Sequence, residues 1–219
     1  MSMSNLKFQD DGRLKLLIIV GTRPEVIRLS EVINKRRRHF DCLLAHTGQN
    51  YDFTLNGIFF RDLSLDDPDV YLDAVGADLG EIVGNIIAAS CKLMVQVQPN
   101  ALLILGDTNS CLSAIAANRL HFPIFHMEAG NRCKDECLPE ETNRRIVDVI
   151  SDVNMAYSKH ARRYLRDTGC ARSAPSSPAL PWPRSCTRTL TRSRPRTSSP
   201  SSALSPSAIC CCLPTARRA

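Results

Sequence analysis

The stretch LKLLIIVGTRPE, residues 14–25, decides the fold class of this chain. Leu14 to Val20 form a short, continuous apolar run with branched residues, which is typical of a strand buried in a parallel sheet. Gly21-Thr22-Arg23-Pro24 breaks the run, and Pro24 lies where a helix begins, because proline is tolerated at the first helical position. Apolar residues at helical spacing follow in Glu25 to Arg36. The stretch therefore predicts a strand, a turn and a helix.

The same alternation continues along the chain. The remaining strands are predicted at residues 41–46, 101–105, 123–126 and 153–157. The remaining helices are predicted at residues 51–60, 79–97, 111–120, 140–150 and 158–167. Strands that alternate with helices indicate an α/β fold with a parallel sheet covered on both faces. Since ligands of such sheets bind beyond the carboxyl ends of the strands, we expect the site there.

The sequence changes character near Cys170. All ten glycines lie before Cys170, and residues 171–219 contain no Gly, Asp, Glu, Lys, Asn or Gln. Residues 1–170 carry 20 Lys+Arg against 22 Asp+Glu, whereas residues 171–219 carry 8 Arg and no acid. The net charge of +6 is therefore a property of the tail alone, and it does not indicate a nucleic-acid-binding protein.

A shifted reading frame accounts for this change. When the last base of each codon is read with the first two bases of the next, residues 177–190 can encode TGSPMAEVLHENL and residues 209–218 can encode LLLSAHREE. Two sensible segments in one shifted frame are hard to obtain by chance. We therefore expect one N-terminal domain at residues 1–170 and an out-of-frame, disordered tail at residues 171–219. The alternatives are a natural disordered Ser/Pro/Arg-rich segment and an Arg/Ser tail that binds nucleic acid.

Size and composition limit the fold and the location that residues 1–170 can have. They suffice for one domain with a core of its own. The start is polar, and we find no stretch that approaches the ~20 apolar residues of a membrane span, so the sequence predicts no membrane partner and a cytoplasmic location. Six scattered cysteines, of which Cys170 is the last, are expected to be free thiols. Cys133 and Cys137 have no second ligand pair, so no metal site is predicted.

Gly21-Thr22-Arg23-Pro24-Glu25 joins a strand to the start of a helix. Free N–H groups at a helix start, together with a guanidinium, suit a phosphate or a carboxylate. A plain turn with a solvated arginine is the alternative. The turn lacks the GxGxxG fingerprint and a Walker A lysine, which disfavours NAD and ATP as its ligands.

Three acids lie in different segments that converge on one sheet edge. Asp107 and Glu128 each follow an apolar strand directly, and Glu140 begins a predicted helix. Converging carboxylates can divide acid and base roles, because their environments push their pKa values apart. A helix cap at Asp107 and a surface charge at Glu140 are the alternatives. His126 points the same way as Glu128 if the strand persists, although a hydrogen-bonded structural histidine is the more frequent case.

Arginines lie close to these acids in sequence. Arg132 and Arg144 flank a loop, and guanidinium groups near carboxylates can clamp a pyrophosphate. The alternative is a solvated helix with i,i+4 pairs such as Glu140–Arg144 and Glu141–Arg145.

Five motifs together resemble the non-hydrolysing UDP-N-acetylglucosamine 2-epimerases. They are Gly21-Thr22-Arg23-Pro24-Glu25, Thr47-Gly48-Gln49, Gly106-Asp107-Thr108, His126-Met127-Glu128-Ala129-Gly130 and Pro139-Glu140-Glu141-Thr142-Asn143-Arg144. The decoded TGSP and SAHREE segments are similar to what this family carries next. The sequence at residues 106–111 and 128–132 resembles the branch of this family that makes capsule and O-antigen sugars. A modified UDP-HexNAc is therefore an expected substrate.

The resemblance implies a GT-B architecture of two Rossmann-like domains with a UDP-sugar in the cleft, of which this chain holds the N-terminal half. It implies epimerisation by elimination and re-addition of UDP, no cofactor, no metal and a homodimer in the full-length protein. The catalytic residues would be Asp107, Glu128 and Glu140. The substrate-binding residues would be Arg23, Thr22, Gln49, Thr108, His126, Arg132 and Arg144.

For the 219-residue chain itself, the resemblance leaves three outcomes. We expect a truncated and inactive epimerase domain, because half a cleft cannot grip a UDP-sugar. A non-catalytic nucleotide-sugar-binding remnant is the second outcome. A fragment of a GT-B glycosyltransferase is the third, and the motifs at residues 21–25 and 128–130 speak against it.

Overall fold

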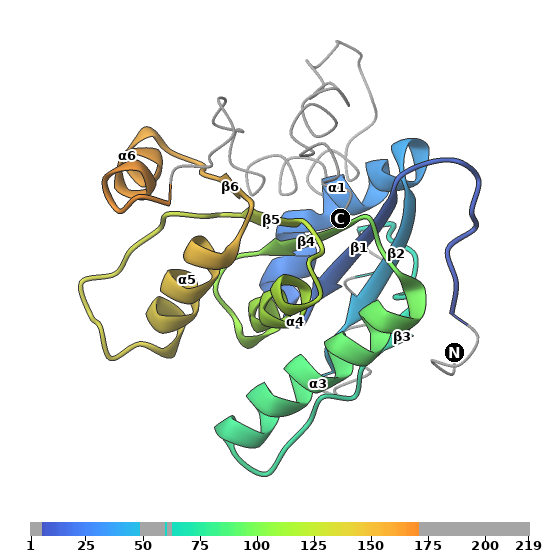
Figure 1. The fold of residues 1–219 in the computed structure, drawn as a ribbon, viewed down its shortest axis with the longest axis horizontal. Helices are drawn as coiled ribbons and strands as arrows, with labels where there is room; N and C mark the ends of the chain where they lie inside the picture. The colour runs from blue at the N-terminus through green and yellow to red at the C-terminus, as the bar shows by residue number, and fades with distance from the viewer. Residues whose placement is uncertain (1–5, 49–59, 61–62, 171–219) are drawn as a thin grey trace, which may run out of the picture.

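The computed structural model describes residues 6–48, 60 and 63–170 of the chain (Figure 1). In this part the strands are β1 (Lys15–Val20), β2 (Asp41–His46), β3 (Val70–Tyr71), β4 (Ala101–Leu105), β5 (Ile124–Met127) and β6 (Val153–Met155). The α-helices are α1 (Arg23–His39), α3 (Leu79–Val97), α4 (Ser113–Arg119), α5 (Pro139–Ile150) and α6 (Lys159–Asp167). A 3-10 helix, η2 (Asn109–Leu112), leads into α4.

The strands form one parallel sheet in the order β3-β2-β1-β4-β5-β6. This order is that of the Rossmann fold, in which the chain reverses its direction of travel between the strands β1 and β4. The last residues of neighbouring strands lie opposite each other, Val20 beside His46 and Leu105 beside Met127. The predicted α/β parallel sheet is confirmed, and the segments that leave its carboxyl edge lie close together.

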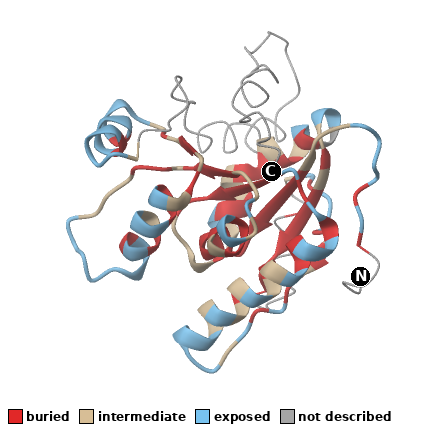
Figure 2. Cartoon of the chain, viewed as in Figure 1, coloured by how far each residue is buried: buried red, intermediate tan, exposed pale blue. Residues whose placement is uncertain are grey.

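Helices cover both faces of the sheet (Figure 2). On one face, Leu17, Ile19 and Leu102 pack against α3, α4 and α5 through residues such as Leu93 and Val147. On the other face, Ile18, Leu103 and Phe125 pack against α1 through residues such as Leu29. Because alternate residues of each strand are buried on opposite faces, the strands read as continuous apolar runs rather than as an alternating pattern.

Helix α3 corrects one sequence-based expectation. Its 19 residues are long and apolar enough to cross a membrane by length and composition, although we expected no such stretch. Ile86, Leu93, Met94 and Val97 nevertheless pack into the core beside the sheet. These four residues lie on one face of the helix, and we therefore interpret α3 as a layer of the α/β fold.

The remaining differences from expectation are local. The two-residue strand β3 was not predicted, because it is too short to show a period; Val70 pairs with Ala45 at the edge of the sheet. The predicted helix 111–120 instead begins as η2, where the N–H of Cys111 donates to the carbonyl of Thr108 at 3.0 Å, an i,i+3 bond that tightens the turn. The helix predicted at 51–60 and the tail predicted at 171–219 lie outside the described residues, apart from Phe60.

Candidate active site

Polar segments leave neighbouring strands at the carboxyl edge of the sheet. Gly21-Thr22 follows β1, Thr47 follows β2, Asp107-Thr108 follows β4 and Glu128 follows β5. The segments after β1 and β4 meet at the reversal point of the strand order, which is where open α/β sheets bind ligands. The segments expected to carry the site therefore lie together at this edge.

Glu25 connects the segment after β1 to the segment after β4. Its buried carboxylate accepts hydrogen bonds from the N–H groups of Gly21 at 2.6 Å and Thr22 at 2.8 Å. It also accepts hydrogen bonds from the hydroxyls of Thr108 at 2.7 Å and Ser110. Burial raises the pKa of Glu25, and these donors act against that increase.

These bonds correct the expectation of free N–H groups at the turn. The N–H groups of Gly21 and Thr22 point at Glu25, so they do not form the anion site that the sequence suggested. Arg23 is half-buried at the start of α1. A Cβ on Gly21 would lie 2.5 Å from Thr47 Oγ1, so only glycine fits where the turn passes the end of β2.

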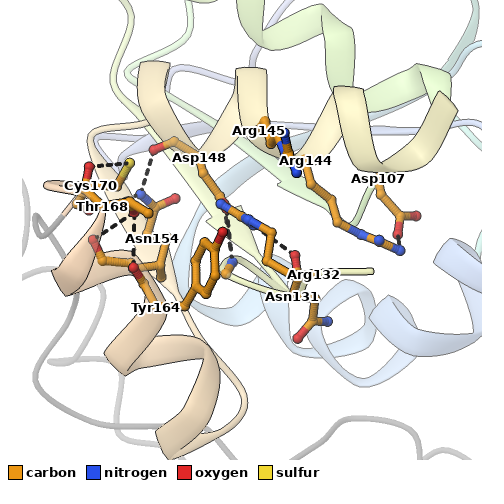
Figure 3. Close-up of polar contacts among 12 residues, drawn as sticks. Asp107, Asn131, Arg132, Arg144, Arg145, Asp148, Asn154, Tyr164, Thr168 and Cys170 are labelled. Carbon is orange, nitrogen blue, oxygen red and sulfur yellow. Dashed lines mark hydrogen bonds and ion pairs between the residues drawn. The ribbon is translucent and has the colours of Figure 1, made fainter. Parts of the chain in front are cut away.

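Asp107 faces helix α5. Arg144 forms an ion pair with the Asp107 carboxylate (Figure 3). The amide of Asn143 donates to the Asp107 carbonyl at 2.9 Å. The same amide donates to Asn109 Oδ1 at 3.2 Å. Two successive residues of α5 therefore hold the loop after β4, and the Arg144 side chain is engaged by protein carboxylates.

Glu128 adopts a left-handed backbone conformation, with φ of 69°. Such conformations are uncommon for residues other than glycine and are concentrated at functional sites. Its carboxylate pairs with Arg28 of α1 at 2.5 Å and accepts a long hydrogen bond of 3.3 Å from Asn131. A Cβ on Gly106 would lie 3.6 Å from Glu128 Oε2, so Glu128 also lies against the segment that carries Asp107.

Charge and burial act on Glu128 together. Burial raises the pKa of Glu128, the Arg28 guanidinium lowers it, and the negative charge of Asp107 raises it further. Arg144 contributes a smaller lowering. The structure therefore brings together two carboxylates and two arginines: Asp107, Glu128, Arg28 and Arg144, which we call the edge cluster. One carboxyl group of this cluster has an increased affinity for a proton, as an acid/base residue requires.

A second charged cluster lies inside the domain. His126 is fully buried; its Nε2 lies 2.8 Å from the carbonyl oxygen of Gly106 and its Nδ1 lies 3.0 Å from Asp148 Oδ1. Arg132 binds Asp148 Oδ2 at 2.6 Å and stacks on the ring of Tyr164 at 4.5 Å (Figure 3). We call His126, Asp148 and Arg132 the core cluster.

The core cluster changes the interpretation of two predicted substrate contacts. His126 is enclosed by protein, which matches the hydrogen-bonded structural histidine that the sequence analysis gave as the more frequent case. Arg132 is engaged with Asp148, with Tyr164 and with the carbonyl of Asn131 at 2.7 Å. Both side chains are therefore held by protein groups in this arrangement.

The acid pair at the start of α5 divides into an exposed and a buried member. Glu140 is exposed and lies one helical turn before Arg144, so it shares the face of α5 that meets Asp107. Glu141 is buried and accepts from the N–H of Cys133 at 3.0 Å and from Arg144 and Arg145. Burial opposes its ionisation, yet these donors together lower the pKa of Glu141.

The other predicted residues have different positions. Thr22 and Thr108 both bond Glu25, and Gln49 lies outside the described residues. Sequence reasoning missed Arg28 as the partner of Glu128. Arg28 follows Arg23 by five residues on the same helix, and no local pattern distinguishes it from a solvated arginine.

In residues 6–48, 60 and 63–170, no group of three or more His, Cys, Asp or Glu side chains is placed to hold a metal ion. The cysteines in the same ranges, including Cys133 and Cys137, are free thiols, as the sequence predicted.

Comparisons with known proteins agree with this arrangement. The family model for UDP-N-acetylglucosamine 2-epimerase matches residues 33–174. The chain is similar to a UDP-2,3-diacetamido-2,3-dideoxy-D-glucuronate 2-epimerase of Pseudomonas aeruginosa, with 36% identity over 74% of this chain and 46% of the relative.

Solved structures give the same result. A UDP-N-acetylglucosamine 2-epimerase from Rickettsia bellii is similar at 43% identity and a TM-score of 0.75, over 82% of this chain and 48% of that one. The Methanocaldococcus jannaschii UDP-GlcNAc 2-epimerase in complex with UDP-GlcNAc and UDP is similar at 35% identity and a TM-score of 0.69, over 71% and 44%. This chain spans about half the length of both solved epimerases.

The chain belongs to the UDP-N-acetylglucosamine 2-epimerase family.

Proposed function

We propose that this chain, as a member of that family, is the N-terminal domain of an enzyme that inverts C2 of a UDP-N-acetylhexosamine. The observation that carries the proposal is the edge cluster. In this cluster Glu128 lies against the loop that carries Asp107, beside the point where the strand order of the sheet reverses. The raised pKa of Glu128 is the property that a proton-transferring carboxyl group needs near neutral pH.

The chemistry explains why carboxylates suffice. The C2 proton beside an acetamido group is not acidic, so simple deprotonation is unavailable. Elimination of UDP across C1–C2 breaks the C1–O bond and the C2–H bond and gives a glycal. Re-addition of UDP at C1, with a proton delivered to the other face of C2, gives the epimer. The reaction needs a base, an acid and stabilisation of the departing diphosphate.

The proposed roles follow from position. Asp107 and Glu128 are the acid/base pair, and Glu140 is a third carboxylate on the α5 face that meets Asp107. Arg23 contacts the diphosphate, since it lies at the start of α1 beside the strand ends. Arg144 acts on the substrate through Asp107, to which it is bound. Gln49 and Thr108 complete the proposed substrate contacts.

The 219-residue chain is proposed to be inactive on its own. It spans about half the length of the relatives it matches, and catalysis needs reacting groups held in a closed geometry. The composition and decoding of residues 171–219 support an out-of-frame tail in place of the second domain. The tail decodes in the shifted frame to segments similar to those of the family.

The sugar is a UDP-N-acetylhexosamine, and two candidates differ in charge. UDP-GlcNAc is the substrate named for the Methanocaldococcus relative, and a diacetamido glucuronate is the substrate named for the Pseudomonas relative. A role in capsule or O-antigen sugar synthesis corresponds to the second. The full-length protein is further proposed to be a cytoplasmic homodimer that uses no cofactor and contacts neither membrane nor nucleic acid.

The test is restoration of the reading frame after residue 170. The restored two-domain protein is expected to interconvert UDP-GlcNAc and UDP-ManNAc, or the UDP-2,3-diacetamido glucuronate pair, whereas the 219-residue chain converts neither. Products are measured by chromatography and proton NMR. Activity of the 219-residue chain would contradict the requirement for a second domain, and an inactive, folded restored protein on both pairs would contradict the proposed reaction.

A further inference from the structure

Glu25 accepts more hydrogen bonds than its place in helix α1 explains. It is the third residue of the helix, a position from which a glutamate commonly accepts the N–H of the residue before the helix. Its Oε2 atom does this, because it accepts from the N–H of Thr22 at 2.8 Å and from that of Gly21 at 2.6 Å. One carboxylate oxygen is therefore enough to cap the start of α1.

The other oxygen of Glu25 binds a distant segment. Oε1 accepts hydrogen bonds from the hydroxyl of Thr108, at 2.7 Å, and from the hydroxyl of Ser110. These two residues follow Glu25 by 83 and 85 positions and belong to the segment after β4. Glu25 and Ser110 are both buried. Capping of α1 needs neither of these bonds, so Oε1 has a separate role.

The segment after β4 is held from two sides. The amide nitrogen of Asn143, on α5, donates to the Asp107 carbonyl at 2.9 Å and to Asn109 Oδ1 at 3.2 Å. The hydroxyls of the two residues that alternate with these donate to Glu25, on α1. Residues 107–110 are therefore clamped between α1 and α5, and their position depends on both helices.

We propose that Glu25 is a positioning residue for Asp107, which fixes the spacing between the Asp107 segment and the turn that leads into Arg23. The inference rests on the proposed function, in which Arg23 contacts the diphosphate and Asp107 transfers a proton. Elimination breaks the C1–O and C2–H bonds of neighbouring carbons, so both groups have to be in place in the same complex. One buried carboxylate that is bonded to both segments sets their separation without contacting the substrate.

Glu25→Gln changes one side of this connection and keeps the other. The N–H groups of Gly21 and Thr22 can only donate, so the amide oxygen of the new side chain is expected to take the place of Oε2. The amide nitrogen then takes the place of Oε1, and the hydroxyls after β4 accept from a neutral N–H instead of donating to a charged oxygen. Charge-assisted hydrogen bonds are the stronger kind, so the variant keeps the helix cap and weakens the hold on the Asp107 segment.

The test is a double-mutant cycle in the frame-restored protein. Glu25→Gln is expected to lower kcat about 5- to 50-fold and to change KM less than about twofold, because a displaced proton-transfer group slows the chemical step more than binding. In the Asp107→Asn background, the same substitution is expected to lower kcat no further. Such non-additivity is expected of residues that act as one unit.

A second variant and a control accompany the cycle. Ser110→Ala removes one donor to Oε1 and leaves the helix cap intact, so we expect a smaller loss of kcat, about three- to tenfold, with the same non-additivity. Glu81→Gln is the matched control: Glu81 is the third residue of α3 and accepts the N–H of Ala77 at 2.7 Å, but it is exposed. It should leave kcat and KM unchanged. Thermal midpoints of all variants show whether each remains folded.

Equal losses of kcat from Glu25→Gln in the parent and Asp107→Asn backgrounds would overturn the inference and assign Glu25 to the stability of the fold. A raised KM with an unchanged kcat would also overturn it, in favour of substrate binding through the Thr108 hydroxyl. If Glu25→Gln does not fold, Ser110→Ala decides by the same comparison. If Asp107→Asn keeps its rate, the proposed function fails; if it loses its rate and the second loss is additive, only the role of Glu25 fails.

Discussion

The edge cluster and the core cluster use the same residue types for different ends. Both pair carboxylates with arginines, and both connect the segment after β4 to the segment around β5. In the core cluster, the His126 and Asp148 side chains are fully enclosed. In the edge cluster, the relative exposures of the four side chains lie between 15% and 33%. Glu128 also has a strained, left-handed backbone conformation.

This difference in exposure separates residues that stabilise the fold from residues that can transfer a proton. Removing one partner of a buried, hydrogen-bonded charge lowers the free energy of unfolding strongly, because the remaining group is left without compensation. A partly exposed carboxylate beside a like charge can exchange a proton with a ligand. We therefore expect the core cluster to control the free energy of unfolding and the edge cluster to control turnover.

The largest expected effect is on stability. Asp148→Ala removes the partner of both His126 and Arg132, and we expect the free energy of unfolding of the 219-residue chain to decrease by about 3–5 kcal/mol. Urea unfolding followed by circular dichroism measures it. Asp167→Ala, which removes an exposed acid beside Arg166, is the matched control and should change stability little. Equal losses in the two variants would contradict the particular contribution of the core cluster to stability.

The next effect is on rate. In the frame-restored protein, Asp107→Asn, Glu128→Gln and Glu140→Gln are each expected to lower turnover by about 10²-fold or more, since each removes a proposed proton-transfer group. Steady-state kinetics on the UDP-sugar measure this loss, with thermal midpoints taken in parallel. Near-normal rates in all three variants would show that the acid/base residues lie elsewhere.

A smaller effect is expected at the diphosphate. Arg23→Ala in the restored protein should lower kcat/KM by about 10- to 100-fold, the range expected for one lost charge-assisted hydrogen bond. Arg166→Ala, on the exposed face of α6, is the control. If Arg23→Ala behaved like this control, Arg23 would not contact the diphosphate.

The smallest effect is a dependence of stability on pH. Folding raises the pKa of Glu128, so its ionisation costs stability as pH increases through the folded-state pKa. Glu128→Gln lacks this cost. The stability of the variant relative to the parent 219-residue chain should therefore increase between pH 4 and pH 8, apart from a constant offset for the lost Arg28 pair. A gap that stayed constant or narrowed over this range would contradict the raised pKa.

The sequence predicted the sheet well because buried parallel strands are continuous apolar runs. The expected residues for β2 and β4 agree with the structure at both ends, as do those for α3. The sequence also located Asp107 and Glu128, because an acid directly after a buried strand has only the crevice to face. It could not foresee Glu25, whose carboxylate satisfies the N–H groups expected to bind an anion. It favoured a structural role for His126 but could not identify the partners, since Gly106 and Asp148 are 20 and 22 residues away.

The proposed elimination mechanism depends most directly on proton transfer at C2. The frame-restored protein is incubated with its UDP-sugar in D₂O, and the product is examined by proton NMR and mass spectrometry. The elimination mechanism predicts one deuterium at C2 of the epimerised product, because the proton is returned from an enzyme carboxyl group to a glycal. The proposed role of Glu128 predicts loss of this exchange in Glu128→Gln. Epimerisation without deuterium at C2 would contradict the elimination mechanism and the role assigned to the edge cluster.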